Sequence, residues 1–171
     1  MSETTPPILE QPAPKDPSES LIKPLLKYKD KLNVSDPNVA VDAKAVVSIA
    51  LGLPEKYRID ALNILAEPAS VDTRSLRETR TGPHRIVDVQ NQLRGAMTAI
   101  ALASTDESVH VAAINALAKG FSVPDLDNRK ETSRGHRMIT QSISTIAVIS
   151  NQTDVLHEAV RVLGDYATRP Q

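Results

Sequence analysis

The sequence predicts an all-α fold of three stacked helical hairpins, preceded by a helix that a proline splits and by a disordered N-terminal tail. Apolar residues recur at spacings of three and four through most of the chain, as they do along one face of a helix. No segment shows the sustained alternation of apolar and polar residues, bounded by turns, that is typical of strands. Similar short motifs also return after 46–52 residues, which favours a helical repeat.

The composition fits a single domain with an aliphatic core, which we place at residues 16–171. A chain of 171 residues is long enough to bury a core, and 40% of its residues are hydrophobic. Aromatic residues make up only 2%, so alanine, valine, isoleucine and leucine must supply the core. The absence of cysteine excludes disulfides and thiolate metal sites. A formal net charge of −1 confines any electrostatic function to local patches.

The N-terminal residues 1–15 predict a flexible tail, because four of them are prolines. The alternative is an arm that docks on a neighbouring subunit through its apolar pair, Ile8-Leu9. The motif Asp16-Pro17 then marks a helix start, since aspartate can cap a helix and proline suits its first turn. Within that helix we expect Pro24 to kink or split the helix, because proline cannot donate a backbone hydrogen bond.

The first predicted hairpin follows Asp36-Pro37, which repeats the same start signal. Its first helix should end at Gly52 and Pro54, because glycine and proline punctuate helix ends. Its second helix should cover residues 55–67 and end before Pro68, which cannot donate a backbone hydrogen bond.

The second predicted hairpin combines a helix at about residues 84–103 with another at 105–119. The stretch Ser104-Thr105-Asp106-Glu107 has the form of a capping box, and Gly120 closes the second helix. The third hairpin should begin near Arg137, and the residue at position 151 or 153 should cap its second helix.

Internal similarity supports the hairpin repeat. The segments at 61–66 and 113–118 agree at four of six positions. Because one hairpin cannot bury its own apolar face, neighbouring copies would have to cover it. The alternative is that alanine-rich amphipathic helices resemble one another without any repeat. Three further motifs take the same place in three predicted helices: Ile49-Ala50-Leu51, Ile100-Ala101-Leu102 and Ile146-Ala147-Val148.

Two basic, glycine-containing segments, 77–85 and 130–137, lead from one predicted hairpin into the next. Arginine guanidinium groups suit phosphate or carboxylate, and Gly82 and Gly135 let the backbone approach an anion. The helices that follow would aim free N–H groups at the same place. We therefore predict one anion-binding loop edge, made by Arg77, Arg80, His84, Arg85, Lys130, Arg134, His136 and Arg137.

Three interpretations of these basic segments remain open. The arginines can be structural, since arginine in loops often caps helix ends or pairs with nearby acids. They can instead bind an acidic protein surface or the phosphates of a nucleic acid. In the nucleic-acid case the contact should not depend on sequence, because phosphates carry no sequence information and aromatic side chains for base stacking are scarce.

Other functional classes have little support in the sequence. It contains no nucleophile elbow, phosphate-binding glycine loop or zinc-binding helix motif, so we expect no catalytic residues, no cofactor and no enzyme. The four histidines, at positions 84, 110, 136 and 157, lack the spacing of a metal site, and we expect His110 and His157 to be partly exposed. No apolar run reaches the roughly 18–20 residues that span a bilayer, and no secretory signal is predicted.

The sequence therefore predicts a non-enzymatic structural subunit of a larger assembly, such as a nucleoprotein or a viral particle (virion). We expect a homo-oligomer or a subunit of a complex, with sequence-independent nucleic acid as a possible partner and no membrane. The expected location is the cytoplasm, or the interior of a virion or other assembly. The alternative function is a protein–protein adaptor or scaffold, in which the arginine loops are only structural.

Overall fold

The computed structural model describes residues 17–72, 83–122 and 129–169, and all regular elements in these ranges are helical. The all-α prediction is therefore confirmed for the described residues. The predicted tail at 1–15 lies outside them. Of the helices in these ranges, none has the length and apolarity that crossing a bilayer requires. The elements are α1 (Pro17–Leu26), α2 (Val39–Gly52), the 3-10 turn η1 (Glu55–Tyr57), α3 (Arg58–Ala69), α4 (Pro83–Leu102), α5 (Glu107–Ala118), the 3-10 turn η3 (Lys119–Ser122), α6 (Arg129–Ser150) and α7 (Thr153–Ala167).

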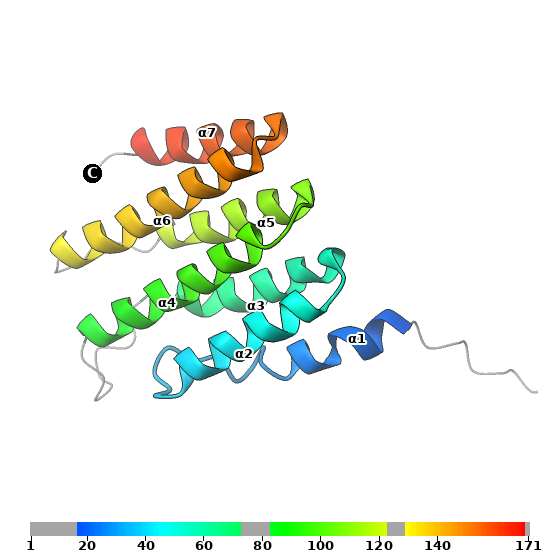
Figure 1. The fold of residues 1–171 in the computed structure, drawn as a ribbon. Helices are drawn as coiled ribbons and strands as arrows, with labels where there is room; N and C mark the ends of the chain where they lie inside the picture. The colour runs from blue at the N-terminus through cyan, green and yellow to red at the C-terminus, as the bar shows by residue number, and fades with distance from the viewer. Residues whose placement is uncertain (1–16, 73–82, 123–128, 170–171) are drawn as a thin grey trace, which may run out of the picture.

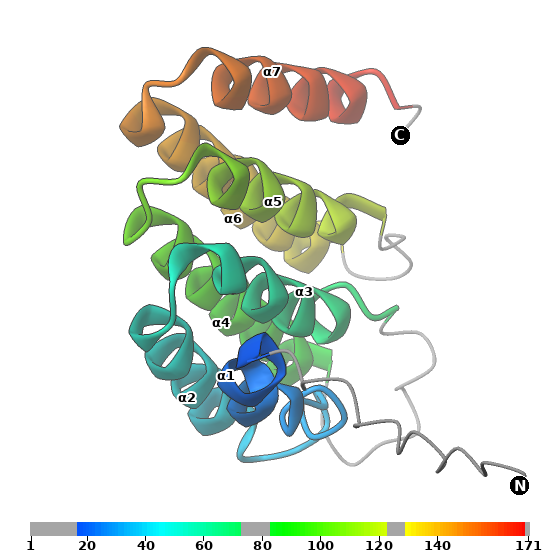
Figure 2. The ribbon, with the colours of Figure 1, turned by 90° about the vertical axis from the view of Figure 1, so that its right-hand side faces the viewer.

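The helices form two columns that run side by side along the molecule (Figures 1 and 2). In one column α4 packs between α2 and α6, and in the other α5 packs between α3 and α7. At one end of the stack, α1 packs against both α2 and α3, and α7 lies at the opposite end. The helices α2, α4 and α6 all begin at the same edge, on the left in Figure 1. That the pairs α2–α3, α4–α5 and α6–α7 are copies of one repeat stays a prediction.

The core is aliphatic, as the scarcity of aromatic residues requires. Alanines such as Ala61, Ala101 and Ala113 have no exposed surface, which lets neighbouring helices approach closely. Each large aliphatic side chain that is fully buried contributes roughly 1.5–3 kcal/mol to stability. The largest of these are Leu25, Leu62, Leu65, Ile86, Leu93, Met97, Ile100, Ile114, Leu117, Ile139, Ile143 and Ile146.

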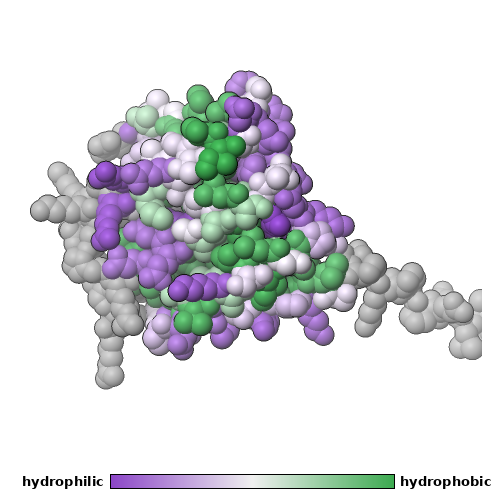
Figure 3. Space-filling model, viewed as in Figure 1, coloured by the Kyte–Doolittle hydropathy of each residue, from purple (hydrophilic) through white to green (hydrophobic). Residues whose placement is uncertain are grey.

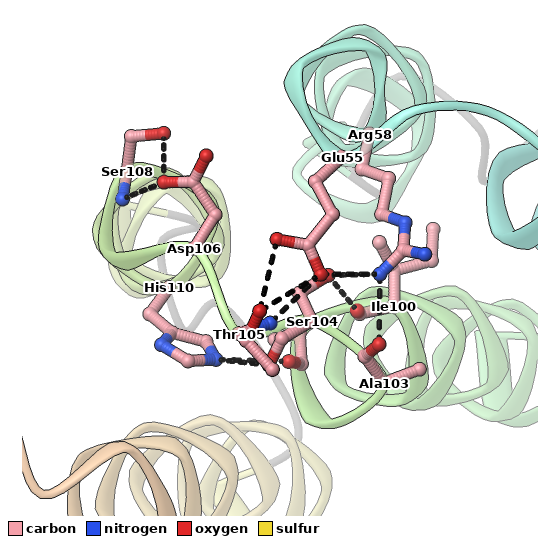
Figure 4. Close-up of polar contacts among 10 residues, drawn as sticks. Glu55, Arg58, Ile100, Ala103, Ser104, Thr105, Asp106, Ser108 and His110 are labelled. Atoms are coloured by element: carbon pink, nitrogen blue, oxygen red, sulfur yellow. Dashed lines mark hydrogen bonds and ion pairs between the residues drawn. The ribbon is translucent and has the colours of Figure 1, made fainter.

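Polar contacts join the first and second helix pairs at the edge where α4 ends (Figure 4). The Arg58 Nη1 donates to the Ala103 carbonyl and to the Ser104 Oγ, both at 2.7 Å. The Glu55 Oε1 accepts from the Thr105 N–H at 2.9 Å. Because the last carbonyls of a helix have no intrahelical partner, these bonds complete the end of α4 while they fix its position against α3.

The side chain of His110 closes the same end of α4 from the other side. Its Nε2 lies 3.1 Å from the Ala101 carbonyl oxygen and 3.0 Å from that of Ser104. Its Nδ1 lies 3.4 Å from the Gln152 Oε1, in the turn between α6 and α7. The expectation that His110 is partly exposed is wrong, because only 5% of its surface is accessible.

A buried arginine of α4, Arg94, bonds the end of α3 at the edge of the molecule opposite to Arg58 and His110. Only 3% of its surface is exposed, and its Nη2 donates to the Ala69 carbonyl at 3.0 Å, at the end of α3. Its Nη1 donates to the Asn91 Oδ1 at 2.9 Å. Burial lowers the pKa of Arg94 to about 10, so the side chain stays protonated at neutral pH.

Two glycines make room for this guanidinium group. A Cβ on Gly120 would lie 2.7 Å from the Ile139 Cδ1 and 3.2 Å from the Arg94 Nη2, and a Cβ on Gly135 would lie 3.1 Å from the Arg94 Nη1. Neither glycine has a positive φ, so space and not backbone conformation requires them. Arg94 therefore sets how closely η3 and α6 approach α4.

Two of the three predicted proline boundaries need correction. Helix α1 is not split by Pro24 but ends two residues after it, and α3 continues through Pro68 to Ala69. Each proline lies in the last turn of its helix, where it removes a single intrahelical hydrogen bond and breaks no following turn.

Two predicted helix starts also need correction. The cap of α5 is Asp106, whose Oδ1 accepts from the Ser108 N–H at 2.8 Å; Ser104 instead donates to the Ile100 carbonyl. Helix α6 begins at Arg129, so the second basic segment is helical and not a loop. It has no counterpart of the proline that starts α4, and a lone glycine costs a helix only about 1 kcal/mol.

The close packing around Arg94 predicts the effect of a single methyl group. Gly120→Ala should lower the free energy of unfolding by about 1–3 kcal/mol, because the new Cβ would overlap Ile139 and crowd Arg94. The matched control is Gly164→Ala in α7, where a Cβ meets nothing within 4 Å. Alanine favours a helix by roughly 0.5–1 kcal/mol, so this variant should be more stable. Denaturant unfolding measures both, and a Gly120→Ala variant as stable as the wild type would contradict the packing.

Candidate anion-binding site

An open groove of about 550 Å³, lined mainly by polar residues, lies between α4 and α6. Two of the eight residues predicted to bind an anion, Arg134 and Arg137, contribute to its wall on α6. The polar wall on α4 faces them across the groove. The complete lining is Asp88, Asn91, Gln92, Arg134, Arg137, Met138 and Gln141.

The two arginines in this groove are available to a partner. Arg134 Nη1 lies 3.5 Å from the Asp88 Oδ1, but the two side chains are 72% and 54% exposed. An exposed ion pair of this kind contributes only about 0–1 kcal/mol, so an incoming anion can compete with Asp88. Within the described ranges Arg137 is exposed and paired with no carboxylate.

The buried Arg94 also orients a donor toward the groove. Because the Oδ1 of Asn91 accepts from the Arg94 Nη1, the side-chain NH₂ of Asn91 remains as the group that can donate elsewhere. Asn91 lines the groove while Arg94 lies behind it. The groove therefore presents guanidinium groups from α6 and an amide donor from α4, which is the donor set that phosphate and carboxylate prefer.

Helix direction adds to the positive potential of this edge. Helices α4 and α6 both begin at the edge marked by the left side of Figure 1. The free N–H groups of a first turn carry a partial positive charge, which falls off within that turn. Arg134 and Arg137 lie one to two turns inside α6, so they extend this positive region along the helix.

The remaining predicted residues divide into two groups. His136 does not line the groove: its Nδ1 lies 3.0 Å from the Tyr166 hydroxyl, and its ring meets Phe121 edge-on at 5.6 Å between centroids. It thereby holds α7 against α6 and η3. The side chains of the other five predicted residues lie outside what the structure describes; these residues are Arg77, Arg80, His84, Arg85 and Lys130. Of the five, His84 and Arg85 fall in the first turn of α4, and Lys130 falls in the first turn of α6.

The α4 wall of the groove was not predicted from the sequence. On α4, Asn91 and Gln92 follow Asp88 at spacings of three and four, so the three form a polar stripe. On α6, the groove residues repeat the same spacings: Arg134, Arg137, Met138 and Gln141. Matching two such stripes on helices of the same column would have found the groove.

No family model, no curated protein and no solved structure matches the chain. In the part of the chain that the structure describes, no three His, Asp or Glu side chains gather as a metal site would require.

The exposure of the groove arginines predicts that they do not hold the fold together. Arg134→Gln and Arg137→Gln should each change the free energy of unfolding by less than about 0.5 kcal/mol. Arg58→Gln is the comparison, because Arg58 donates to two acceptors on α4 and its turn, and its loss should cost about 1–3 kcal/mol. Thermal and denaturant unfolding of the three variants decide the point. A loss of stability in Arg134→Gln as large as in Arg58→Gln would mean that the groove arginines are structural.

Proposed function

We propose that the protein is a non-enzymatic structural subunit of a larger assembly, such as a nucleoprotein or a virion, and that it contacts an anionic partner along the α4–α6 edge. The observation that carries the proposal is the convergence of Arg134, Arg137 and the Asn91 amide on one open groove. The proposed place of action is the cytoplasm or the interior of such an assembly.

Phosphate is the anion that we propose for this groove. Guanidinium forks and amide donors bind phosphate oxygens, and a series of phosphates could follow the open groove. Base stacking has little support, since the rings of Phe121 and Tyr166 stack on each other at 4.1 Å and Tyr28 is only 9% exposed. The proposed partner is therefore a nucleic-acid backbone that is recognised without regard to sequence.

We further propose that the three helix pairs are copies of one repeat of 46–52 residues. Burial agrees with the register that the sequence motifs suggest. The alanine in each of the three motifs is buried, at positions 50, 101 and 147, and the residue after it is exposed. Those exposed residues are Leu51 at 41%, Leu102 at 40% and Val148 at 74%.

These exposed residues also favour a second candidate function, a protein–protein adaptor with structural arginines. Figure 3 shows hydrophobic residues gathered in a band that runs along the stack, away from the edge where α4 and α6 begin. A contiguous apolar surface of this kind is typical of a protein–protein contact. The two candidates differ in whether the arginine groove has a ligand of its own.

Nucleic-acid binding by matched variants tests the first candidate. The double variant Arg134→Gln, Arg137→Gln should bind a random-sequence oligonucleotide at least about tenfold more weakly at low salt, because each lost phosphate contact also loses counterion release. The slope of log affinity against log salt should fall by up to about two. Asp88→Asn should bind more tightly, since it frees Arg134 from its ion pair. Fluorescence anisotropy over a salt series measures all three.

Arg161→Gln is the control for this experiment. Arg161 is exposed but lies on α7, paired with Glu158 and Asp165, so its loss should leave binding unchanged. Equal affinities of the groove variant and the control variant would refute an anion site at the α4–α6 edge. A wild-type protein that binds no oligonucleotide at low salt would favour the adaptor.

A further inference from the structure

The last helix exposes a position that the helices before it bury. In the proposed repeat, Leu62 of α3, Ile114 of α5 and Val160 of α7 are equivalent. Leu62 and Ile114 are completely buried, whereas Val160 is 70% exposed. The helix α5 packs on α3 and α7 packs on α5, but no described helix packs on the far side of α7. The exposure of Val160 therefore marks the place where the stack stops.

A neighbouring repeat position changes in the same way. Arg58 and His110 both use polar atoms to bond the turn that ends α4, but the equivalent residue of α7 is Leu156, which is 40% exposed. Leu156 and Val160, the two positions at which α7 differs from the helices before it, are here called the tail face.

The opposite end of the stack has its own exposed apolar residues. Leu21 and Leu26 of α1 are 44% and 47% exposed, and Val41 of α2 is 67% exposed. Figures 1 and 2 place α1 and α2 at the end of the molecule furthest from α7. Leu21, Leu26 and Val41 are here called the head face.

The two ends of the stack differ in charge. Around the head face, residues 20–38 contain four lysines against two aspartates, and Lys23, Lys27 and Lys29 are exposed with no ion pair in the described part of the chain. Helix α7 contains three acidic residues against one arginine. Beside it, a hydrogen bond to Asp154 raises the pKa of the Glu107 carboxyl, so negative charge is crowded at this end.

We propose that the tail face of one copy docks on the head face of a second copy, so that the stack of helices continues from one molecule to the next. Apolar side chains would meet at the centre, and the head-face lysines would lie against the acids of α7 and Glu107. A symmetric contact between two tail faces would instead bring acid against acid, which costs free energy. The head-to-tail arrangement therefore agrees with both apolarity and charge.

After each further copy is added, such a contact leaves one head face and one tail face of the assembly unoccupied. A head-to-tail interface closes into a ring if its rotation permits, and otherwise grows into a filament. The inference specifies the self-association that the proposed structural subunit needs, and it does not depend on the anion site between α4 and α6. The assembly should weaken as salt rises, because its charge contribution lies at exposed residues.

Paired interface variants of the full-length protein test this arrangement. Val41→Glu disables the head face and Val160→Glu the tail face, and both positions are exposed enough for folding to be retained. We expect the wild type to form species larger than a dimer and each variant alone to be monomeric. An equimolar mixture of the two variants should give a heterodimer, since one intact tail and one intact head remain. Light scattering coupled to size exclusion gives the masses.

Each other outcome overturns the proposal. A wild type that stays monomeric at its highest soluble concentration excludes the contact. A Val41→Glu variant that still dimerises, with no gain on mixing, indicates a symmetric tail contact. Circular dichroism must show folded variants, and Val160→Ser replaces Val160→Glu if the latter unfolds. The variant Arg134→Gln, Arg137→Gln should assemble like the wild type, so failure of the anion site and failure of the head-to-tail contact give different results.

Discussion

The buried guanidinium group of Arg94 is the constraint on which the rest of the arrangement depends. A charged group that is 3% exposed needs partners inside the protein, and its Nη2 and Nη1 bond the end of α3 and the Asn91 side chain, whereas its Nε has no partner. A Cβ at either of two neighbouring glycines, Gly120 and Gly135, would crowd this group at 3.1–3.2 Å. Because Gly135 lies in α6, the same group fixes where α6 packs on α4, and so places Arg134 beside the groove.

The remaining helices follow from this placement. Once α6 is fixed, His136 on it bonds Tyr166 of α7 and meets Phe121 of η3, which positions the last helix and its tail face. The aliphatic core supplies most of the free energy of folding, but it does little to fix how the helices align with one another, since alanines and leucines pack in several similar ways. Polar contacts at both edges, from Arg58 at one and Arg94 at the other, remove that freedom.

The sequence predicted what depends on local pattern and missed what depends on packing between helices. Apolar spacing located the helices, and the predicted start of α4 at about residue 84 was correct to within one position. The start of α6 was missed because the second basic segment, 130–137, was taken as a loop. The burial of Arg94 and His110 could not be inferred, since each is surrounded by helix neighbours of ordinary pattern. Arg134 and Arg137 were found by charge alone, whereas Asn91 becomes part of a site only through the packing of α4 on α6.

Hydrogen exchange of an Arg94→Lys variant tests most directly whether this guanidinium group holds the stack together. Lysine keeps the charge but has a single ammonium group, which cannot reproduce the two separate bonds to Ala69 and Asn91. We expect faster amide exchange in the last turn of α3 and the first half of α6, with α1 unchanged. Exchange that is unaltered in both segments, or that increases in α1 instead, would contradict it.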